Sequence, residues 1–164
     1  MCGIAGVWNR EPNAPVAADL LERMAAVLHH RGPDDRGVWT GGGGGLAATR
    51  LSVVDLVGGH QPLTNETGSI AVALNGEIYN HAALRRALER EGHVFRTRVD
   101  TEVLAHGYET WGARGLAQRL EGMFAAAVYD VEAHRLVLLR DRLGVKPLYL
   151  AEIATGVVFG SELK

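Results

Sequence analysis

Apolar positions along the chain form short runs bounded by glycine, proline and asparagine, and most runs are rich in small or β-branched residues. Such runs are typical of strands, because branched side chains pack well on a pleated sheet. The predicted strands are Ile4–Trp8, Val38–Trp39, Leu46–Leu56, Ser69–Leu74, Phe124–Asp130, Arg135–Arg140, Leu148–Leu150 and Val157–Phe159. The glycine run at 41–45 predicts a tight or flexible loop between two of them.

Other segments carry apolar residues at helical spacing. The predicted helices are 17–28, 81–91 (capped by Asn80 and ended by Gly92), one that is capped by Asp100 or Thr101, and Leu116–Leu120. Strands and helices do not alternate regularly, which disfavours a doubly wound parallel sheet. The order favours an α+β fold in which helices are segregated from the sheets.

The length and composition fit one domain, which we assign to residues 1–164. The formal net charge of −2 gives no indication of a nucleic-acid partner. No apolar run reaches the roughly 20 residues of a membrane span, so we expect no membrane partner. The single cysteine allows no internal disulfide and no secretory signal is visible, so we expect a cytoplasmic protein.

Cys2 occupies a position where a thiol and a free α-amine would belong to one residue after removal of Met1. Their reference pKa values, about 8.5 and about 7.7–8.0, make proton transfer from sulfur to nitrogen unfavourable by only ~1 kcal/mol. One residue would then supply a nucleophile and its base, an arrangement known for N-terminal threonine. The alternative is a small cysteine that packs like a hydrophobic residue.

Asn75-Gly76 follows a predicted strand and allows two interpretations. Asparagine-glycine pairs commonly form tight hairpin turns, because both residues tolerate positive φ. The pair could instead form an oxyanion hole from the Asn75 side-chain amide and the Gly76 N–H group.

Arg50, Glu77 and Asp100 are candidates for binding a charged substrate. Arg50 interrupts an apolar strand, where it either faces solvent or presents a bidentate donor to a carboxylate. Asp100 either caps the helix that follows it or pairs with an ammonium group. Glu77 is either a solvated turn carboxylate or a second partner for that ammonium group.

The seven histidines show no metal-ligand spacing: His29 and His30 are adjacent and diverge on a helix, and no His-x3-His pair is present. We therefore predict no metal site. The sequence lacks a Gly-x-Ser-x-Gly nucleophile elbow, so a serine hydrolase is not indicated. Arg140-Asp141-Arg142 is interpreted as a charged turn at a strand end, where an exposed ion pair would contribute only ~0–1 kcal/mol.

Several ordered motifs that together span the chain resemble the N-terminal glutaminase domain of glutamine-hydrolysing asparagine synthetases. These motifs are Met1-Cys2-Gly3-Ile4-Ala5-Gly6, Arg31-Gly32-Pro33-Asp34, Leu51-Ser52-Val53-Val54-Asp55, Gln61-Pro62-Leu63, Asn75-Gly76-Glu77-Ile78-Tyr79-Asn80, Arg140-Asp141-Arg142-Leu143-Gly144-Val145-Lys146-Pro147-Leu148-Tyr149 and Gly160-Ser161-Glu162-Leu163-Lys164. Their joint order is much more specific than any one motif.

The resemblance implies the N-terminal-nucleophile hydrolase fold, a four-layer αββα sandwich of two mainly antiparallel sheets between helix layers. It also implies hydrolysis of L-glutamine to L-glutamate and ammonia through a γ-glutamyl thioester. The implied catalytic residues are Cys2, Asn75 and Gly76; the implied substrate-binding residues are Arg50, Glu77, Asp100 and the backbone around Val53 and Val54.

In such synthetases a second domain adenylates aspartate, and the ammonia forms asparagine. Its Ser-Gly-Gly-x-Asp-Ser loop is absent from this chain, so we expect ATP and Mg only on a synthetase domain in cis or trans and no cofactor here. Whether the chain is a homodimer is left open. Two alternatives also remain: a glutaminase that serves another carboxylate acceptor, and a non-catalytic module that binds glutamine or docks a partner.

Overall fold

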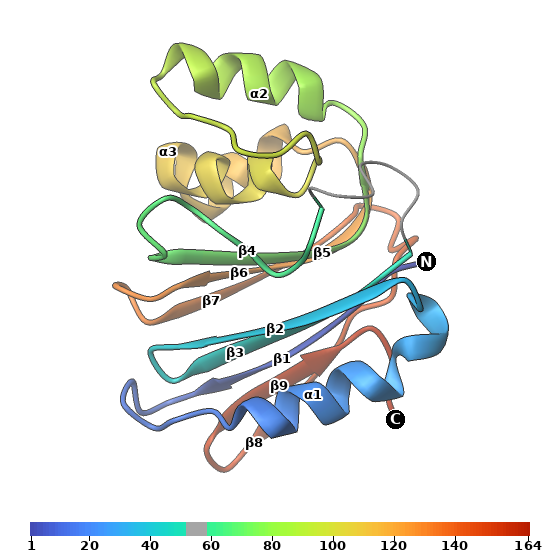
Figure 1. Ribbon diagram of the computed structural model, residues 1–164. Helices are drawn as coiled ribbons and strands as arrows, with labels where there is room; N and C mark the ends of the chain where they lie inside the picture. Colours follow the sequence, from blue (N-terminus) through green and yellow to red (C-terminus); the bar gives the residue numbers. More distant parts are fainter. Residues whose placement is uncertain (52–58) are drawn as a thin grey trace.

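Two antiparallel sheets stack face to face in the computed structural model, which describes residues 1–51 and 59–164. One sheet has the strand order β2-β3-β1-β9-β8 and the other β4-β5-β6-β7. Helix α1 covers the outer face of the first sheet, α3 covers the outer face of the second, and α2 packs on α3 (Figure 1). This is the αββα sandwich that the resemblance implied.

The elements follow the predicted ones closely. The helices are α1 (Ala18–Val27), η1 (His29–Arg31), α2 (His81–Arg90) and α3 (Glu102–Arg119), and the strands are β1 (Gly3–Asn9), β2 (Asp35–Gly41), β3 (Gly44–Arg50), β4 (Leu63–Thr64), β5 (Ile70–Ile78), β6 (Gly122–Asp130), β7 (Arg135–Arg140), β8 (Tyr149–Ile153) and β9 (Gly156–Gly160). The prediction missed β4 and η1. The predicted strand Leu46–Leu56 is described only as far as β3, because residues 52–58 lie outside the described part.

The glycine run makes a tight hairpin between β2 and β3. Gly42 and Gly43 have φ angles of +53° and +76°, a region that side chains with a Cβ rarely adopt. The neighbouring glycines of the run belong to the strands themselves. The glycine run therefore forms the hairpin turn between β2 and β3.

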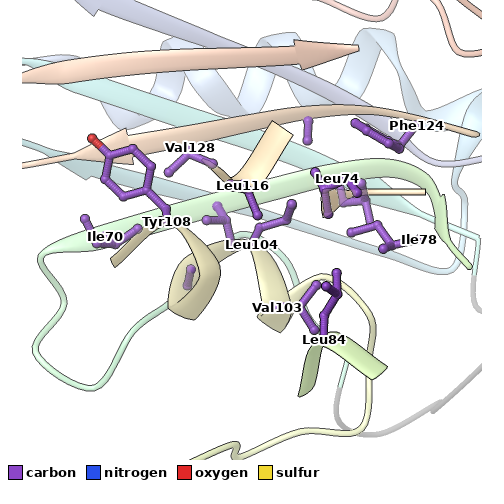
Figure 2. Close-up of a cluster of buried hydrophobic side chains, with 14 of the residues drawn as sticks. Ile70, Leu74, Ile78, Leu84, Val103, Leu104, Tyr108, Leu116, Phe124 and Val128 are labelled. Atoms are coloured by element: carbon purple, nitrogen blue, oxygen red, sulfur yellow. The ribbon is translucent and has the colours of Figure 1, made fainter. Parts of the chain in front are cut away.

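Alternation along β5 and β6 builds two separate cores. Small residues face the space between the sheets, among them Ala71 and Ala73 of β5 and Ala125 and Ala127 of β6. The opposite face of the same strands carries larger side chains that pack against α3. Figure 2 shows this second core, in which Val103, Leu104, Tyr108 and Leu116 lie against Ile70, Leu74 and Val128.

Helix α3 contains both helices that the sequence predicted beyond Asp100. The helix is interrupted at Gly112, whose φ and ψ angles of 64° and 179° are not helical. Asn80 stands at the start of α2 as predicted, but its side chain makes no capping bond. It binds the carbonyl of Arg119 and the N–H of Glu121 instead, and so joins the ends of the two helices. The capping prediction for Asn80 was wrong because these tertiary partners occupy its amide.

Among the described residues, no helix combines the length and apolarity that crossing a bilayer requires.

Candidate active site

A cavity of about 250 Å³ opens at the end of the sandwich where the N-terminus lies and where β5 leaves its sheet (Figure 1). Its volume is below the ~300–1,000 Å³ typical of pockets for drug-sized ligands, which suits a small substrate. The described residues that line it are Met1, Cys2, Arg50, Leu51, Gly59, Gln61, Asn75, Gly76, Glu77, His81, Arg98, Val99, Asp100, Thr101, Met123 and Lys146. The cavity thus gathers residues from distant parts of the sequence.

Cys2 enters the cavity immediately before β1, with a free and half-buried thiol. Its carbonyl accepts a hydrogen bond from Arg31 Nε at 3.0 Å, and Arg31 in turn pairs with Glu162 at 3.0 Å. On the other side, the N–H of Ile4 donates to Ser161 Oγ at 3.0 Å. Side chains from two segments, around Arg31 and around Ser161, therefore hold the backbone on both sides of Cys2.

Asn75 and Gly76 do not form a turn, so the hairpin interpretation was wrong. Both lie within β5, where they pair with Ala125 and Phe124 of β6. The Asn75 side chain is fully buried, and neither its Nδ2 nor its Oδ1 has a hydrogen-bond partner among the described residues. A buried amide without hydrogen-bond partners destabilises the folded state by about 1–3 kcal/mol. Its presence in the wall of a cavity therefore indicates that it binds a ligand.

Gly76 has a φ angle of +133°, and a Cβ there would overlap the carbonyl oxygen of Met123. Only glycine fits this backbone, which turns away from regular strand geometry beside Asn75. The adjacent Glu77 is exposed and also lines the cavity.

Arg50 ends β3 and is buried, with an exposed fraction of 7%. Its guanidinium lies against Gly59, where a Cβ would overlap Nη2 and Cζ. The interpretation of Arg50 as a solvent-facing strand residue was therefore wrong. The missing side chain at Gly59 makes room for a cation in the wall of the cavity.

Asp100 does not cap α3 through its side chain. Its Oδ2 accepts a hydrogen bond from the N–H of Ile78 at 2.8 Å, at the end of β5. Burial raises the pKa of Asp100, and the Ile78 hydrogen bond and the nearby His81 only partly oppose this. Thr101, the other predicted cap, makes no capping bond either and instead accepts a hydrogen bond from Gln61 Nε2 at 3.2 Å.

Gln61, Arg98 and Lys146 are among the cavity residues that were not assigned a role from the sequence. Gln61 joins β5 to the start of α3, because its Oε1 accepts a hydrogen bond from the N–H of Leu74 at 2.7 Å. Arg98 and Lys146 add two cations to the cavity wall. Gln61 and Lys146 lie in motifs that carried the family resemblance, so position within those motifs was the available signal.

The predicted charged turn at a strand end follows β7, and within it the buried Asp141 positions Lys146. Asp141 is buried, and its carboxylate accepts hydrogen bonds from the N–H groups of Phe124, Leu143, Val145 and Lys146. Burial alone would raise the pKa of Asp141, but these N–H groups outweigh it and hold the pKa below its ordinary value. The turn is therefore organised by the negative charge of Asp141, which backbone N–H groups stabilise.

The wall of the cavity carries both cations and carboxylates. Arg50, Arg98 and Lys146 are the cations, and Glu77 and Asp100 are the carboxylates. This arrangement complements a small zwitterion such as a free amino acid. The predicted residues Val53 and Val54 lie outside the described residues.

Comparisons with known proteins place the chain in a family. The sequence profile of the glutamine amidotransferase domain matches residues 1–164. The chain is 42% identical to asparagine synthetase [glutamine-hydrolyzing] 2 of Bacillus subtilis over 168 residues, and 42% identical to asparagine synthetase [glutamine-hydrolyzing] 3 of Arabidopsis thaliana over 165 residues. All of the chain is covered in both alignments, but it spans only 22% and 28% of those proteins.

The fold has a solved counterpart. The glutamine phosphoribosylpyrophosphate amidotransferase of B. subtilis superposes with a TM-score of 0.77 at 23% identity, over 98% of this chain and 42% of that one. A likeness at this identity concerns the fold, whereas the sequence profile covers every residue of the chain. The chain therefore belongs to the glutamine amidotransferase domain family.

Proposed function

We propose that the chain hydrolyses L-glutamine to L-glutamate and ammonia, with Cys2 as the nucleophile. The sulfur attacks the side-chain amide carbon of glutamine and forms a tetrahedral oxyanion. Collapse of that intermediate expels ammonia and leaves a γ-glutamyl thioester on Cys2. Water then attacks the thioester, which releases glutamate and regenerates the thiol.

The observation that carries this proposal is the unpartnered amide of Asn75 in the same cavity wall as Cys2. Its Nδ2 is a hydrogen-bond donor with nothing to bind among the described residues, next to the N–H of Gly76. Two such donors stabilise an oxyanion in the transition state of acyl transfer. Since the donors are fixed within β5, they need no reorganisation when charge develops.

Recognition of glutamine is assigned to the charged residues. The Arg50 guanidinium binds the α-carboxylate, and Asp100 and Glu77 bind the α-ammonium group. The bidentate geometry of arginine suits a carboxylate, and the ionised form of Asp100 is required for its role. With the α-carboxylate and the α-ammonium group held, the side-chain amide of glutamine is directed toward Cys2.

Removal of Met1 is part of the proposal. Met1 lines the cavity, is mostly exposed, and its sulfur accepts a contact from Lys146 Nζ at 3.3 Å. Its loss enlarges the cavity and converts the amide nitrogen of Cys2 into an amine. That amine takes the thiol proton and later returns it to the leaving ammonia.

We further infer that the ammonia serves asparagine synthesis from aspartate on a synthetase domain in cis or trans. The support comes from the relatives, which are glutamine-hydrolysing asparagine synthetases, longer proteins that contain a region like this chain. ATP and Mg belong to that synthetase domain in this proposal. A cytoplasmic location follows from the need for a reduced Cys2 thiol.

The experiment measures glutamate release by wild type and Cys2→Ala, each alone and with an asparagine synthetase domain from a relative. Glutamate release by wild type and none by Cys2→Ala supports the proposal. Equal rates in the two proteins refute the role of Cys2, and no release under either condition refutes glutaminase activity. With ¹⁵N-amide glutamine, aspartate and ATP, label in asparagine identifies the acceptor, whereas label only in free ammonia argues against it.

A further inference from the structure

His93, His106 and Glu109 bring three metal-ligating atoms together outside the glutaminase cavity. His93 Nδ1 lies 3.1 Å from His106 Nδ1, His106 Nδ1 lies 3.3 Å from Glu109 Oε2, and His93 Nδ1 lies 3.9 Å from the same oxygen. Ligands at the usual 2.0–2.1 Å from a tetrahedral zinc ion are roughly 3.3 Å apart. The triangle therefore has the size that one such ion requires.

The backbone fixes all three residues in place. His106 and Glu109 stand three positions apart on α3, so their side chains share one helix face. His93 follows Gly92 at the end of α2, where its N–H donates to the carbonyl of Leu88 and Gly92 has a φ angle of +98°. Because this is a standard glycine-ended helix terminus, His93 is directed toward α3 without added strain.

In His93 and Glu109, the polar atom that does not belong to the triangle already has a hydrogen-bond partner. His93 Nε2 is 2.7 Å from Thr110 Oγ1, and Glu109 Oε1 accepts a hydrogen bond from Asn65 Nδ2 at 2.8 Å. Partners of this kind orient metal ligands in protein sites. They leave His93 Nδ1 and Glu109 Oε2 directed toward the common centre.

Two further carboxylates lie near the third ligand, His106. The His106 side chain is 2% exposed, and its Nε2 lies 3.7 Å from Glu102 Oε1 and 3.9 Å from Glu66 Oε1. Carboxylates beside the outer nitrogen of a histidine favour the tautomer whose inner nitrogen carries a lone pair. Together with Glu109, they supply three negative charges that favour a dication.

Without a cation, these atoms are held by hydrogen bonds to one another. Two imidazole nitrogens that face each other at 3.1 Å must share one proton to avoid facing lone pairs. A metal ion accepts both lone pairs and the carboxylate oxygen at once. The side chains of His93 and Glu109 are 21% and 29% exposed, so solvent reaches the centre and an ion can enter.

We propose that His93, His106 and Glu109 form a binding site for one divalent transition-metal ion of the zinc class, with water as the fourth ligand. Two imidazoles and one carboxylate suit Zn²⁺, and Co²⁺ takes the same geometry. The prediction of no metal site rested on sequence spacing. Spacing shows the pair on α3 but not His93, which the fold brings from another segment.

The test is a titration of the purified, chelator-treated chain with Co²⁺, followed by visible absorption, and with Zn²⁺, followed by calorimetry. We expect saturation at one ion per chain and an intense tetrahedral cobalt band. At a free Zn²⁺ concentration 100 times the Kd, the thermal midpoint should rise by about 5–10 °C. Absence of saturable binding would overturn the site.

Variants at partly exposed positions test the ligands without removing a buried residue. Glu109→Gln and His93→Gln preserve side-chain size and should each weaken Kd by at least about 100-fold. Thr110→Val removes the partner of His93 and should weaken Kd by about 10–100-fold. Far-ultraviolet circular dichroism of the metal-free variants verifies folding, and wild-type affinity in the folded ligand variants would overturn the proposal.

Two controls separate this site from other metal-binding groups. His60 pairs with Asp35 at 2.9 Å, so His60→Gln removes an exposed histidine–carboxylate pair and should leave Kd unchanged. Cys2→Ser removes the thiol and should also leave Kd unchanged. Loss of binding in Cys2→Ser but not in the Glu109 and His93 variants would place the ion on the thiol and refute the site.

Discussion

The carboxylate of Asp100 accepts a hydrogen bond from the backbone N–H of Ile78, and this bond ties the segment before α3 to the end of β5. Asn75 and Gly76 lie in the same strand, three and two positions before Ile78, respectively. The residue assigned to the substrate ammonium group thus fixes the strand that carries the proposed oxyanion donors. Substrate binding and oxyanion geometry therefore share one structural element.

Asp100→Asn tests separately how the carboxylate affects the stability of the fold and how it affects the binding of glutamine. Burial raises the pKa of Asp100, so the ionised form destabilises the folded state above that pKa, and this cost vanishes as pH falls through it. The variant keeps an oxygen acceptor for Ile78 and should unfold at the same or a higher temperature than wild type at pH 7. Its KM for glutamine should be about 10–100-fold higher, with little change in kcat.

The pH dependence gives a second readout for Asp100. In wild type, KM should rise as the pH falls through the raised pKa of Asp100, because the neutral acid no longer pairs with ammonium. The KM of Asp100→Asn should not change over the same range. Steady-state kinetics measures both, and parallel profiles of the two proteins would contradict the assigned role.

Asn75→Ala should lower kcat without lowering stability. Loss of one oxyanion donor costs about 10²–10³-fold in kcat. The variant also removes a buried amide that has no partner among the described residues, so its thermal midpoint should equal or exceed that of wild type.

Asn65→Ala is the matched control for Asn75→Ala. Asn65 is equally buried, but its amide binds Ser69, Glu109 and the N–H of Ile70. We expect this variant to lose about 1–3 kcal/mol of stability and to keep its kcat. If Asn75→Ala instead lost stability and kept kcat, Asn75 would be a structural residue.

Gly59→Ala tests the placement of Arg50. The added methyl group overlaps the guanidinium, whose flexible side chain can move aside at small cost to folding. A displaced guanidinium should raise KM for glutamine about tenfold or more. Gly160→Ala is the control, because its Cβ meets only ordinary contacts of 3.4 Å or more and lies outside the cavity. An unchanged KM in Gly59→Ala would exclude Arg50 as the carboxylate partner.

Asp141→Asn tests the turn beside the cavity. The amide keeps one acceptor oxygen but presents a donor to N–H groups, so we expect a loss of about 2–4 kcal/mol at pH 7. The lowered pKa of Asp141 means that its stabilisation is present above the ordinary pKa of 3.8 and is lost as pH falls through the folded value.

Urea unfolding between pH 7 and pH 3 measures this contribution. The difference between wild type and Asp141→Asn should shrink toward the acid end of the range. Asp19→Asn serves as control, since its pair with Arg23 is exposed and should contribute less than about 1 kcal/mol. A constant difference at all pH values would show that the charge of Asp141 is not the stabilising feature.

Local pattern predicted most helices and strands because each carries its own periodicity. The errors occurred where a distant partner decides the structure. Asn75-Gly76 has the sequence of a turn, yet pairing with β6 extends the strand through it. Asp100 has the sequence of a helix cap, yet its carboxylate binds β5. In both cases the partner lies far away in the sequence.

The cavity residues were predictable only in part. Local chemistry gave Cys2, Arg50, Glu77 and Asp100 a functional and a structural interpretation each, and only the family resemblance favoured the functional one. Arg98 carries no local signal, because an arginine before a polar turn is usually solvated. The cluster at His93 was equally hidden, since its ligands come from two segments whose proximity depends on the packing of α2 on α3.

The central claim is that Cys2, as the first residue of the mature chain, forms a γ-glutamyl thioester. The most direct measurement is the intact mass of the purified chain before and after treatment with an electrophilic glutamine analogue. We predict a mass that lacks Met1, followed by one adduct that peptide mapping assigns to Cys2. Glutamate release by a chain that retains Met1 and gains no adduct at Cys2 would contradict the account.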